Sequence, residues 1–242
     1  MSAPLFLVDE LPGGSAYTLT GPEGHHAADV QRLRPGEALI LSDGRGGTAS
    51  ATVTAVRRGS VDLAVDVRHR ADPPDPRLVV VQAIAKGDRG ELAVQSMTEV
   101  GVDEIVPWAA SRSVAQWRGE RGAKSRERWI ATAREAAKQA RRAWLPAVGA
   151  ECATTQVAAR LARAAGAFVL HEAATDRLST AELPATGEIV LVVGPEGGIT
   201  DAELAAFGAA GASAVRLGDP VLRTSTAGVA ALSVLSVRLS RW

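Results

Sequence analysis

Two glycine-rich segments near the end of the chain carry the residues best placed for chemistry. Gly194-Pro-Glu-Gly-Gly198 follows the apolar run 189–193, and residues 217–226 follow a second apolar run at 214–217. An apolar run that breaks at glycine and leads into a helix predicts a strand–loop–helix unit, and loops of this kind bind ligands in α/β proteins. Neither segment matches the phosphate-binding pattern G-x-x-x-x-G-K-[ST] or the dinucleotide pattern G-x-G-x-x-G. The two segments therefore predict one pocket with backbone amides and carbonyls in its wall, outside the common nucleotide sites.

Two charged residues in these segments are not explained by local structure. Glu196 stands between glycines, ahead of the helix cap, where an acid has no packing role; a solvated turn acid is the alternative. Arg223 precedes a predicted helix start, where a cation opposes the helix dipole. Arg223 therefore suggests a partner anion, such as an RNA phosphate or an acid, and the alternative is a surface salt bridge of little energetic value. By contrast, Thr200 and Glu203 fit a capping box and predict only the start of a helix.

Other chemistries find little support in the sequence. His171 and Glu172 follow a predicted strand directly, at the strand end where α/β folds bind ligands. We find no Ser-His-Asp order, no metal-ligand spacing and no nucleophilic cysteine pattern. Cys152 is the single cysteine, which excludes an internal disulfide. Hydrolase and metalloenzyme functions are therefore poor candidates, and no metal is predicted.

A local basic cluster accompanies a net charge of zero. Basic residues dominate between Arg118 and Arg142, and the predicted helix 125–143 places four of them on one face: Arg134, Lys138, Arg141 and Arg142. A local patch can supply phosphate affinity even when the total charge is neutral. RNA contact is the functional hypothesis, and a solvated basic face tempered by neighbouring acids is the alternative.

The pattern along the chain predicts two domains. Short strands are predicted at residues 4–8, 16–20, 37–42, 48–56 and 61–67, with one helix at about 25–33. A proline-rich linker at 71–76 marks the boundary, so we predict domains at 1–72 and 73–242. The second part alternates predicted strands, at 78–85, 105–109, 167–170, 189–193 and 214–217, with helices at 89–100, 125–143, 155–164, 200–210 and 226–239. This alternation predicts an α/β fold with a parallel sheet and helices on both faces.

Composition and the last helix predict where the protein is located and whether it forms oligomers. No apolar run approaches the length of a membrane span and the first residues lack a signal-peptide pattern, so the sequence predicts a cytoplasmic protein. The helix at 226–239 is apolar on nearly every side, which predicts burial on more than one face. A two-fold homodimer would bury the second face, and packing against the helix at 89–100 within one chain is the alternative.

Eight segments in order, over nearly the whole length, resemble one known family. They are His25–Gly36, Asp43–Gly46, Lys86–Arg89, Thr98–Val102, Arg112–Val114, Glu135–Arg142 and the two glycine-rich loops. The chain is similar to the 16S ribosomal RNA uracil-N3 methyltransferases of the SPOUT, or knotted, superfamily. It departs from the family pattern at Pro4, Ser96, Asp219, Pro220 and Ser225.

The resemblance implies a fold, a cofactor and a substrate. It implies a PUA-like RNA-binding β-barrel at 1–72 and, at 73–242, a SPOUT α/β domain whose deep trefoil knot binds S-adenosylmethionine (SAM). The implied substrate is N3 of a uridine in the 16S rRNA of the small ribosomal subunit, and the implied assembly is a homodimer through the C-terminal domain. Glu196 is the candidate base or orienting group, and Arg223 is the candidate partner of the uracil anion or a phosphate.

The residue-level predictions follow the same resemblance. The cofactor-binding candidates are Leu170, His171, Glu172, Val193, Gly194, Pro195, Gly197, Gly198, Leu217, Gly218, Leu222, Thr224 and Thr226. The RNA-binding candidates are His25, Arg32, Arg34, Arg45, Lys86, Arg134, Lys138, Arg141 and Arg142. Two other functions stay open: an RNA-binding module without catalysis, and a knotted methyltransferase that acts on another atom such as a ribose 2′-hydroxyl.

Overall fold

The computed structural model describes residues 3–242, and the chain divides into two compact units. The first unit runs to Pro73 and also includes Ala137–Leu145; the second comprises Pro74–Ala136 and Pro146–Trp242. The proline-rich linker thus lies where the first unit ends. The return of residues 137–145 to the first unit is not apparent from the sequence pattern.

The first unit is built on a five-stranded sheet with the order β1-β3-β4-β5-β2. Its strands are β1 (Leu5–Leu7), β2 (Ala16–Leu19), β3 (Ala38–Ser42), β4 (Gly47–Arg57) and β5 (Ser60–Arg70). Strands β1 and β3 are parallel, and the other neighbours are antiparallel. The helix predicted at about 25–33 lies earlier in the chain, at 21–30, as two pieces: α1 (Gly21–His25) and the π-helix η1 (His26–Val30). The core contains Phe6, Leu41 and Leu63, which are almost fully buried.

Residues 137–145 complete this first unit. The indole Nε1 of Trp144 donates to the carbonyl oxygen of Asp72 at 3.0 Å, and the Leu145 N–H donates to Gly44 O at 3.0 Å. A Cβ on Gly44 or Gly46 would come within 2.7 Å of the side chains of Leu145 or Trp144, respectively, and both glycines have positive φ. The close approach of the returning segment therefore explains why glycine occupies both positions in the Asp43–Gly46 turn.

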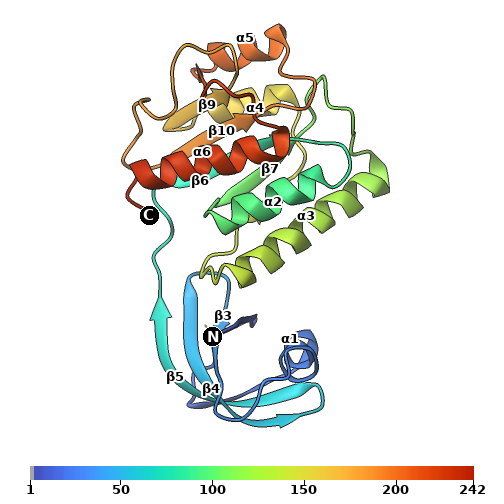
Figure 1. The fold of residues 1–242 in the computed structure, drawn as a ribbon, viewed down its shortest axis with the longest axis vertical. Coiled ribbons are helices and arrows are strands. Elements are labelled where there is room, and N and C mark those ends of the chain that lie inside the picture. The colour runs from blue at the N-terminus through green and yellow to red at the C-terminus, as the bar shows by residue number, and fades with distance from the viewer. Residues whose placement is uncertain (1–2) are drawn as a thin grey trace. The chain divides into compact units, whose positions relative to one another are not determined.

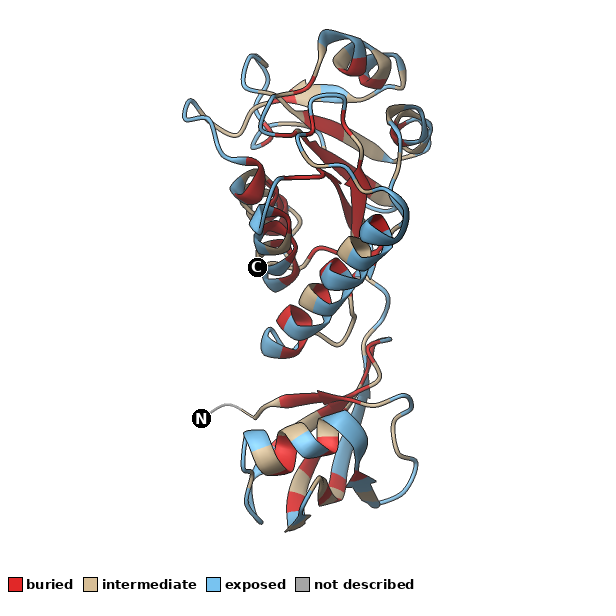
Figure 2. Ribbon diagram, turned by 90° about the vertical axis from the view of Figure 1, so that its right-hand side faces the viewer, coloured by how far each residue is buried: buried red, intermediate tan, exposed pale blue. Residues whose placement is uncertain are grey.

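The second unit contains a six-stranded sheet, parallel throughout, with the order β11-β9-β10-β6-β7-β8. Its strands are β6 (Arg77–Ala83), β7 (Glu104–Trp108), β8 (Ala147–Val148), β9 (Gly166–Leu170), β10 (Glu188–Val193) and β11 (Ser213–Val215). Figure 2 shows that its central strands are buried along their length, as expected for a sheet covered on both faces. The two-residue strand β8 was not predicted.

Helices cover both faces of this sheet (Figure 1). One face carries α2 (Arg89–Glu99), the first part of α3 (Gly119–Gln139) and α6 (Thr224–Arg238), whose buried residues include Met97, Trp129 and Leu232. The other face carries α4 (Thr154–Leu161) and α5 (Asp201–Ala209), with Leu161 and Phe207 in the core. The α/β class with a parallel sheet, predicted from alternation, is confirmed.

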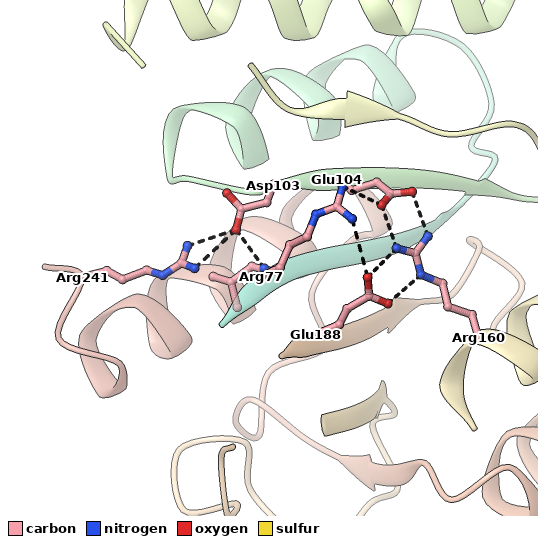
Figure 3. Close-up of polar contacts among 7 residues, drawn as sticks. Arg77, Asp103, Glu104, Arg160, Glu188 and Arg241 are labelled. Carbon is pink, nitrogen blue, oxygen red and sulfur yellow. Dashed lines mark hydrogen bonds and ion pairs between the residues drawn. The ribbon is translucent and has the colours of Figure 1, made fainter. Parts of the chain in front are cut away.

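The amino-terminal edge of the sheet is joined by a cluster of ion pairs (Figure 3). Arg160 donates to both oxygens of Glu104, at 2.8 and 2.7 Å, and to both oxygens of Glu188, at 2.9 and 2.8 Å. Arg77 pairs with Glu104 at 2.9 Å. Burial alone would raise the pKa of Glu104, but the hydrogen bonds and charges of Arg160 and Arg77 outweigh it and lower that pKa. The cluster ties β6, β7, β10 and α4 together at the edge away from the strand C-termini.

Within residues 3–242, no helix combines the length and apolar character needed to cross a membrane.

Candidate functional site

A cavity of about 740 Å³ opens at the carboxyl ends of the parallel strands in the second unit. Its wall is formed by three loops: residues 170–172 after β9, residues 193–199 after β10, and residues 215–224 after β11. Arg89 at the start of α2 and Arg112 in the loop after β7 complete it. The carboxyl edge of an open parallel sheet is where α/β folds bind ligands.

The cavity lies beside the point where the strand order reverses. Along the chain β6 is followed by β7 and β8 on one side, and later strands fill the other side, so the reversal falls between β6 and β10. The loops that leave these two strands are joined, because the Lys86 N–H donates to Glu196 Oε1 at 3.1 Å. Arg89 Nη1 lies 3.5 Å from the same oxygen. Glu196 therefore connects the loop after β10 to the loop after β6 and to α2.

Hydrogen bonds also join the loop after β10 to the loop after β11. The Thr224 hydroxyl donates to the carbonyl oxygen of Gly194 at 2.8 Å and accepts from Nε2 of Gln82 at 2.9 Å. A Cβ on Gly194 would lie 2.8 Å from the side chain of Ile199, so only glycine lets this loop turn so tightly. The cavity walls are thus fixed relative to one another by backbone and buried polar contacts.

A third connection places Arg112 against the same loop. Arg112 Nη1 donates to Gly197 O at 3.2 Å, and a Cβ on Gly197 would lie 3.0 Å from Cβ of Arg112. The preceding residue, Ser111, donates its N–H to Glu203 Oε1 at 2.8 Å, while Oε2 of Glu203 accepts from Thr200, as the capping box predicts. Burial alone would raise the pKa of Glu203, but the hydrogen bonds from Ser111 and Thr200 outweigh it and lower that pKa. This buried carboxylate therefore holds the loop that carries Arg112.

The charged residues of the cavity wall include four arginines, Arg89, Arg112, Arg216 and Arg223, and three acids, Glu172, Glu196 and Asp201. Arg89 pairs with Glu196, and Arg216 Nη1 lies 3.2 Å from Asp219. The exposed side chain of Arg223 has no hydrogen-bond or ion-pair partner within residues 3–242. Arg223 is thus a cation at the cavity that is available to an incoming anion.

Comparison with known proteins identifies the family to which this chain belongs. A model of the RNA methyltransferase domain matches residues 73–236, and a model of the RNA methyltransferase PUA domain matches residues 19–66. Ribosomal RNA small subunit methyltransferase E of Mycobacterium bovis is 46% identical over 247 residues, which cover 100% of this chain and 94% of that protein. This chain belongs to the ribosomal RNA small subunit methyltransferase E family.

Solved structures agree with membership of the methyltransferase E family. The enzyme of that name from Neisseria gonorrhoeae, bound to S-adenosyl methionine, has a TM-score of 0.85 at 28% identity, with 98% of each chain covered. A Legionella pneumophila protein in complex with bound SAM has a TM-score of 0.86 at 28% identity, again with 98% of each chain covered. The resemblance in the sequence and the combination of a PUA domain with an α/β domain are therefore confirmed. The trefoil knot stays a prediction.

The structure brings most of the cofactor candidates together. Every one of them except Thr226 lines the cavity. Thr226 is exposed on the first turn of α6, where its hydroxyl donates to Arg223 O at 3.2 Å. The candidates for catalysis, Glu196 and Arg223, line the same cavity. Lining residues outside the predicted segments are Arg89, Arg112, Ile199, Asp201, Val215, Arg216 and Ala227.

The RNA-binding candidates are distributed over both units. Lys86 and Arg134 belong to the second unit, and the others belong to the first: His25, Arg32, Arg34, Arg45, Lys138, Arg141 and Arg142. Lys138 is 8% exposed, and its Nζ lies 3.0 Å from Glu23 Oε1, within the first unit. Helical spacing places Lys138 on one face with Arg134 and Arg141, but here the end of α3 packs against α1. Lys138 is thus less accessible to RNA than Arg134 and Arg141, which are exposed.

Proposed function

We propose that this protein transfers a methyl group from SAM to N3 of a uridine in the 16S rRNA of the small ribosomal subunit, in the cytoplasm. Support for the cofactor comes from the cavity at the carboxyl edge of the sheet and from two relatives of similar fold that bind SAM. Support for the substrate comes from the curated relatives, which are small-subunit rRNA methyltransferases, and from the sequence resemblance to the uracil-N3 enzymes.

The cavity wall suits the adenosyl part of SAM. The glycine loop presents close-packed backbone, since Cβ atoms at Gly194 and Gly197 would meet neighbouring atoms at 2.8 and 3.0 Å. The apolar side chains of Val193, Leu217 and Leu222 supply flat contact for a purine. SAM would supply an electrophilic methyl group on a positive sulfur, which no protein side chain offers.

The remaining chemistry belongs to the uracil and the residues around it. The neutral imide N3 is a poor nucleophile, so its proton must pass to solvent water as the new bond between N3 and carbon forms. The bond between sulfur and that carbon would break, with its electron pair left on sulfur. A paired base must also be extruded to reach a pocket. In this proposal Arg223 stabilises the uracil anion or an adjacent phosphate, and Glu196 orients the nucleotide from its fixed position beside Lys86 and Arg89. Holding both reactants in line then supplies much of the rate enhancement.

One observation carries the proposal: Arg223, whose side chain has no partner inside residues 3–242, lines the cavity in the loop after β11, which is hydrogen-bonded to the loop after β10. A cation placed at a helix N-terminus without an internal partner is unfavourable, and an anionic ligand would reverse that cost. The other two functions weigh less. A non-catalytic RNA module gives no reason for the cavity, and a ribose 2′-hydroxyl enzyme lacks the sequence resemblance to the uracil-N3 enzymes.

Two measurements test the proposed function. SAM should bind the purified protein in a calorimetric titration. Gly218→Val should abolish that binding, because Gly218 lines the cavity, its Cβ position meets only Pro220 Cδ at an ordinary contact distance of 3.7 Å, and its φ is accessible to valine. Gly208→Val in α5 is the matched control, since nothing lies within 4 Å of its Cβ position and it is outside the cavity. No SAM binding by the parent protein would overturn the proposal.

The second measurement identifies the product. Mass spectrometry of 16S rRNA nucleosides from a strain lacking this gene should show loss of 3-methyluridine, restored by the intact gene and not by the Gly218→Val form. A lost ribose-methylated nucleoside would instead support the 2′-hydroxyl alternative. An unchanged nucleoside profile together with retained RNA binding would support the non-catalytic module.

We also propose that the active form is a homodimer through α6. Part of α6 packs on the sheet and against α2, so the alternative of burial within one chain accounts for one side of the helix. Large apolar side chains in and near this helix nevertheless remain exposed, including Val221, Leu222, Val237 and Trp242. A two-fold partner presenting the same surface would cover them.

A further inference from the structure

A buried amide in the centre of the sheet contacts the loops of the cavity. Gln82 lies in β6, beside Val193 of β10 and Pro107 of β7, and none of its surface is exposed. Its Nε2 lies 2.9 Å from the hydroxyl oxygen of Thr224 and 3.2 Å from Ala83 O. Sequence reasoning placed Gln82 inside an apolar strand and gave it no role.

The direction of the hydrogen bonds through Thr224 is fixed by chemistry. The Gly194 carbonyl oxygen, 2.8 Å from the hydroxyl, can only accept, so the single hydroxyl proton of Thr224 points to it. The hydroxyl oxygen must then accept from residue 82. An amide N–H can donate there, whereas a carboxylate or an apolar side chain cannot. The chain of donation therefore runs from Gln82 to Thr224 to Gly194.

The other end of the same amide is not satisfied. Gln82 Oε1 is fully buried and has no hydrogen-bond partner within residues 3–242. A buried acceptor without a partner destabilises the folded state, so an apolar residue of similar size would serve the core at least as well. The energetics of folding alone give no reason for glutamine at this position. What glutamine adds is a donor toward the residue that joins two walls of the cavity.

We infer that Gln82 is a positioning residue, which through Thr224 fixes the distance between the loop after β10 and the loop after β11 and so keeps the cavity shaped for SAM. The inference rests on the proposed function for the identity of the ligand. Gln82 contacts neither the cavity nor the reacting atoms; it acts through Thr224, which lines the cavity directly. Loss of the amide donor would leave the Thr224 hydroxyl held only by its bond to Gly194 O, and would loosen the two loops together.

The test compares Gln82→Met with Gln95→Met. Gln95 is exposed in α2, where its side chain is hydrogen-bonded to Glu99. Gln95→Met therefore makes the same chemical change away from the cavity. Gln82→Met should weaken SAM binding about tenfold, the value of one net hydrogen bond. It should raise the KM for SAM by a similar factor while kcat changes less than threefold. Because it removes an unpaired buried oxygen, Tm should stay the same or rise, an outcome that a purely structural role would not give.

A second pair of variants keeps the inference testable if Gln82→Met does not fold. Thr224→Ser retains the hydroxyl and should bind SAM almost as the parent does, while Thr224→Ala should lose about tenfold in affinity. Unchanged SAM affinity in folded Gln82→Met, or equal affinities for Thr224→Ser and Thr224→Ala, would overturn the inference. Absence of SAM binding by the parent protein would instead overturn the proposed function, so the two failures are distinguishable.

Discussion

The backbone N–H of Lys86 donates to Oε1 of Glu196 at 3.1 Å, and this bond joins the loops after β6 and β10 where the strand order reverses. Since Arg89 also lies beside this oxygen, one carboxylate oxygen is already occupied by two donors. This arrangement favours an orienting role for Glu196 over that of a general base.

The two roles of Glu196 predict different mutant kinetics. Glu196→Gln keeps an oxygen that accepts from Lys86, so methyl transfer should fall by no more than about threefold. In Glu196→Ala the methyl-transfer rate should fall about tenfold to one hundredfold, as expected when a hydrogen bond to a charged group is lost. Single-turnover rates at saturating SAM provide the measurement. If the Gln and Ala forms are equally slow, Glu196 is the base after all.

Arg223 should affect the reaction and leave the fold intact. Its side chain has no partner within the described chain, so Arg223→Gln is expected to keep the parent Tm and SAM affinity. The methyl-transfer rate should fall at least about tenfold, because a developing negative charge loses its cation. Arg163→Gln, an exposed change just after α4, serves as control. Parent-level activity in Arg223→Gln would exclude a role for Arg223 in the reaction.

Basic residues on α3 and after it should set the salt dependence of RNA binding. Arg134 and Arg141 are exposed, and we expect Arg134→Gln/Arg141→Gln to weaken binding to a 16S rRNA fragment. Each lost phosphate contact should reduce the slope of log K against log salt by roughly 0.7 to 0.9. Filter binding at several salt concentrations measures that slope, with Arg163→Gln as the matched neutralisation. An unchanged slope would favour the solvated basic face.

The Glu104–Arg160 pair predicts how stability depends on pH. The pKa of Glu104 is lowered in the folded state, so its contribution is complete above the pKa of the unfolded chain, about 4.3, and is lost as pH falls through the folded value. Glu104→Gln should cost about 2 kcal/mol near pH 7, because Arg160 loses a charged partner. The difference in unfolding free energy from urea titrations should shrink below about pH 4. A difference independent of pH would show that the charge of Glu104 contributes nothing.

The exposed end of α6 tests the homodimer. Val237 is 62% exposed, and Val237→Lys would place a charge in the proposed interface. Light scattering at low micromolar concentration should give about half the parent mass for this variant, since an unpaired charge in an apolar interface is strongly unfavourable. Val67→Lys on β5 of the first unit, at 68% exposure, is the control. A monomeric and fully active parent protein would contradict the dimer.

The order of the elements in the second unit is predictable because its strands are long, apolar and separated by helical periodicity. The two-residue strand β8 is too short for its periodicity to be detected, and α3 begins at Gly119, ahead of the predicted start at residue 125. Lys138 shows that helical periodicity cannot predict which residues a helix face contacts. Its periodicity gives a face, but only the folded chain shows that this face meets Glu23.

The cavity was predictable where its residues are contiguous and much less where they are not. The loops after β9, β10 and β11 follow directly from strand ends, and the candidates chosen there line the cavity. Arg89 and Arg112 reach it from other elements through Glu196 and Gly197, contacts that depend on strand order. Gln82 could not be distinguished from its apolar neighbours, because its importance lies in the direction of a hydrogen bond.

The division of the first unit along the chain has a consequence for synthesis on the ribosome. Its strands emerge early, but Trp144 and Leu145, which cover the turn at Gly44 and Gly46, emerge only after β6, β7 and the whole of α3. Domains usually fold as units, with the N-terminal one first as the chain is made. The residues that cover this turn are therefore made only after residues 74–136 of the other unit have been translated. A fragment that stops at the linker would lack these residues and would leave that turn uncovered.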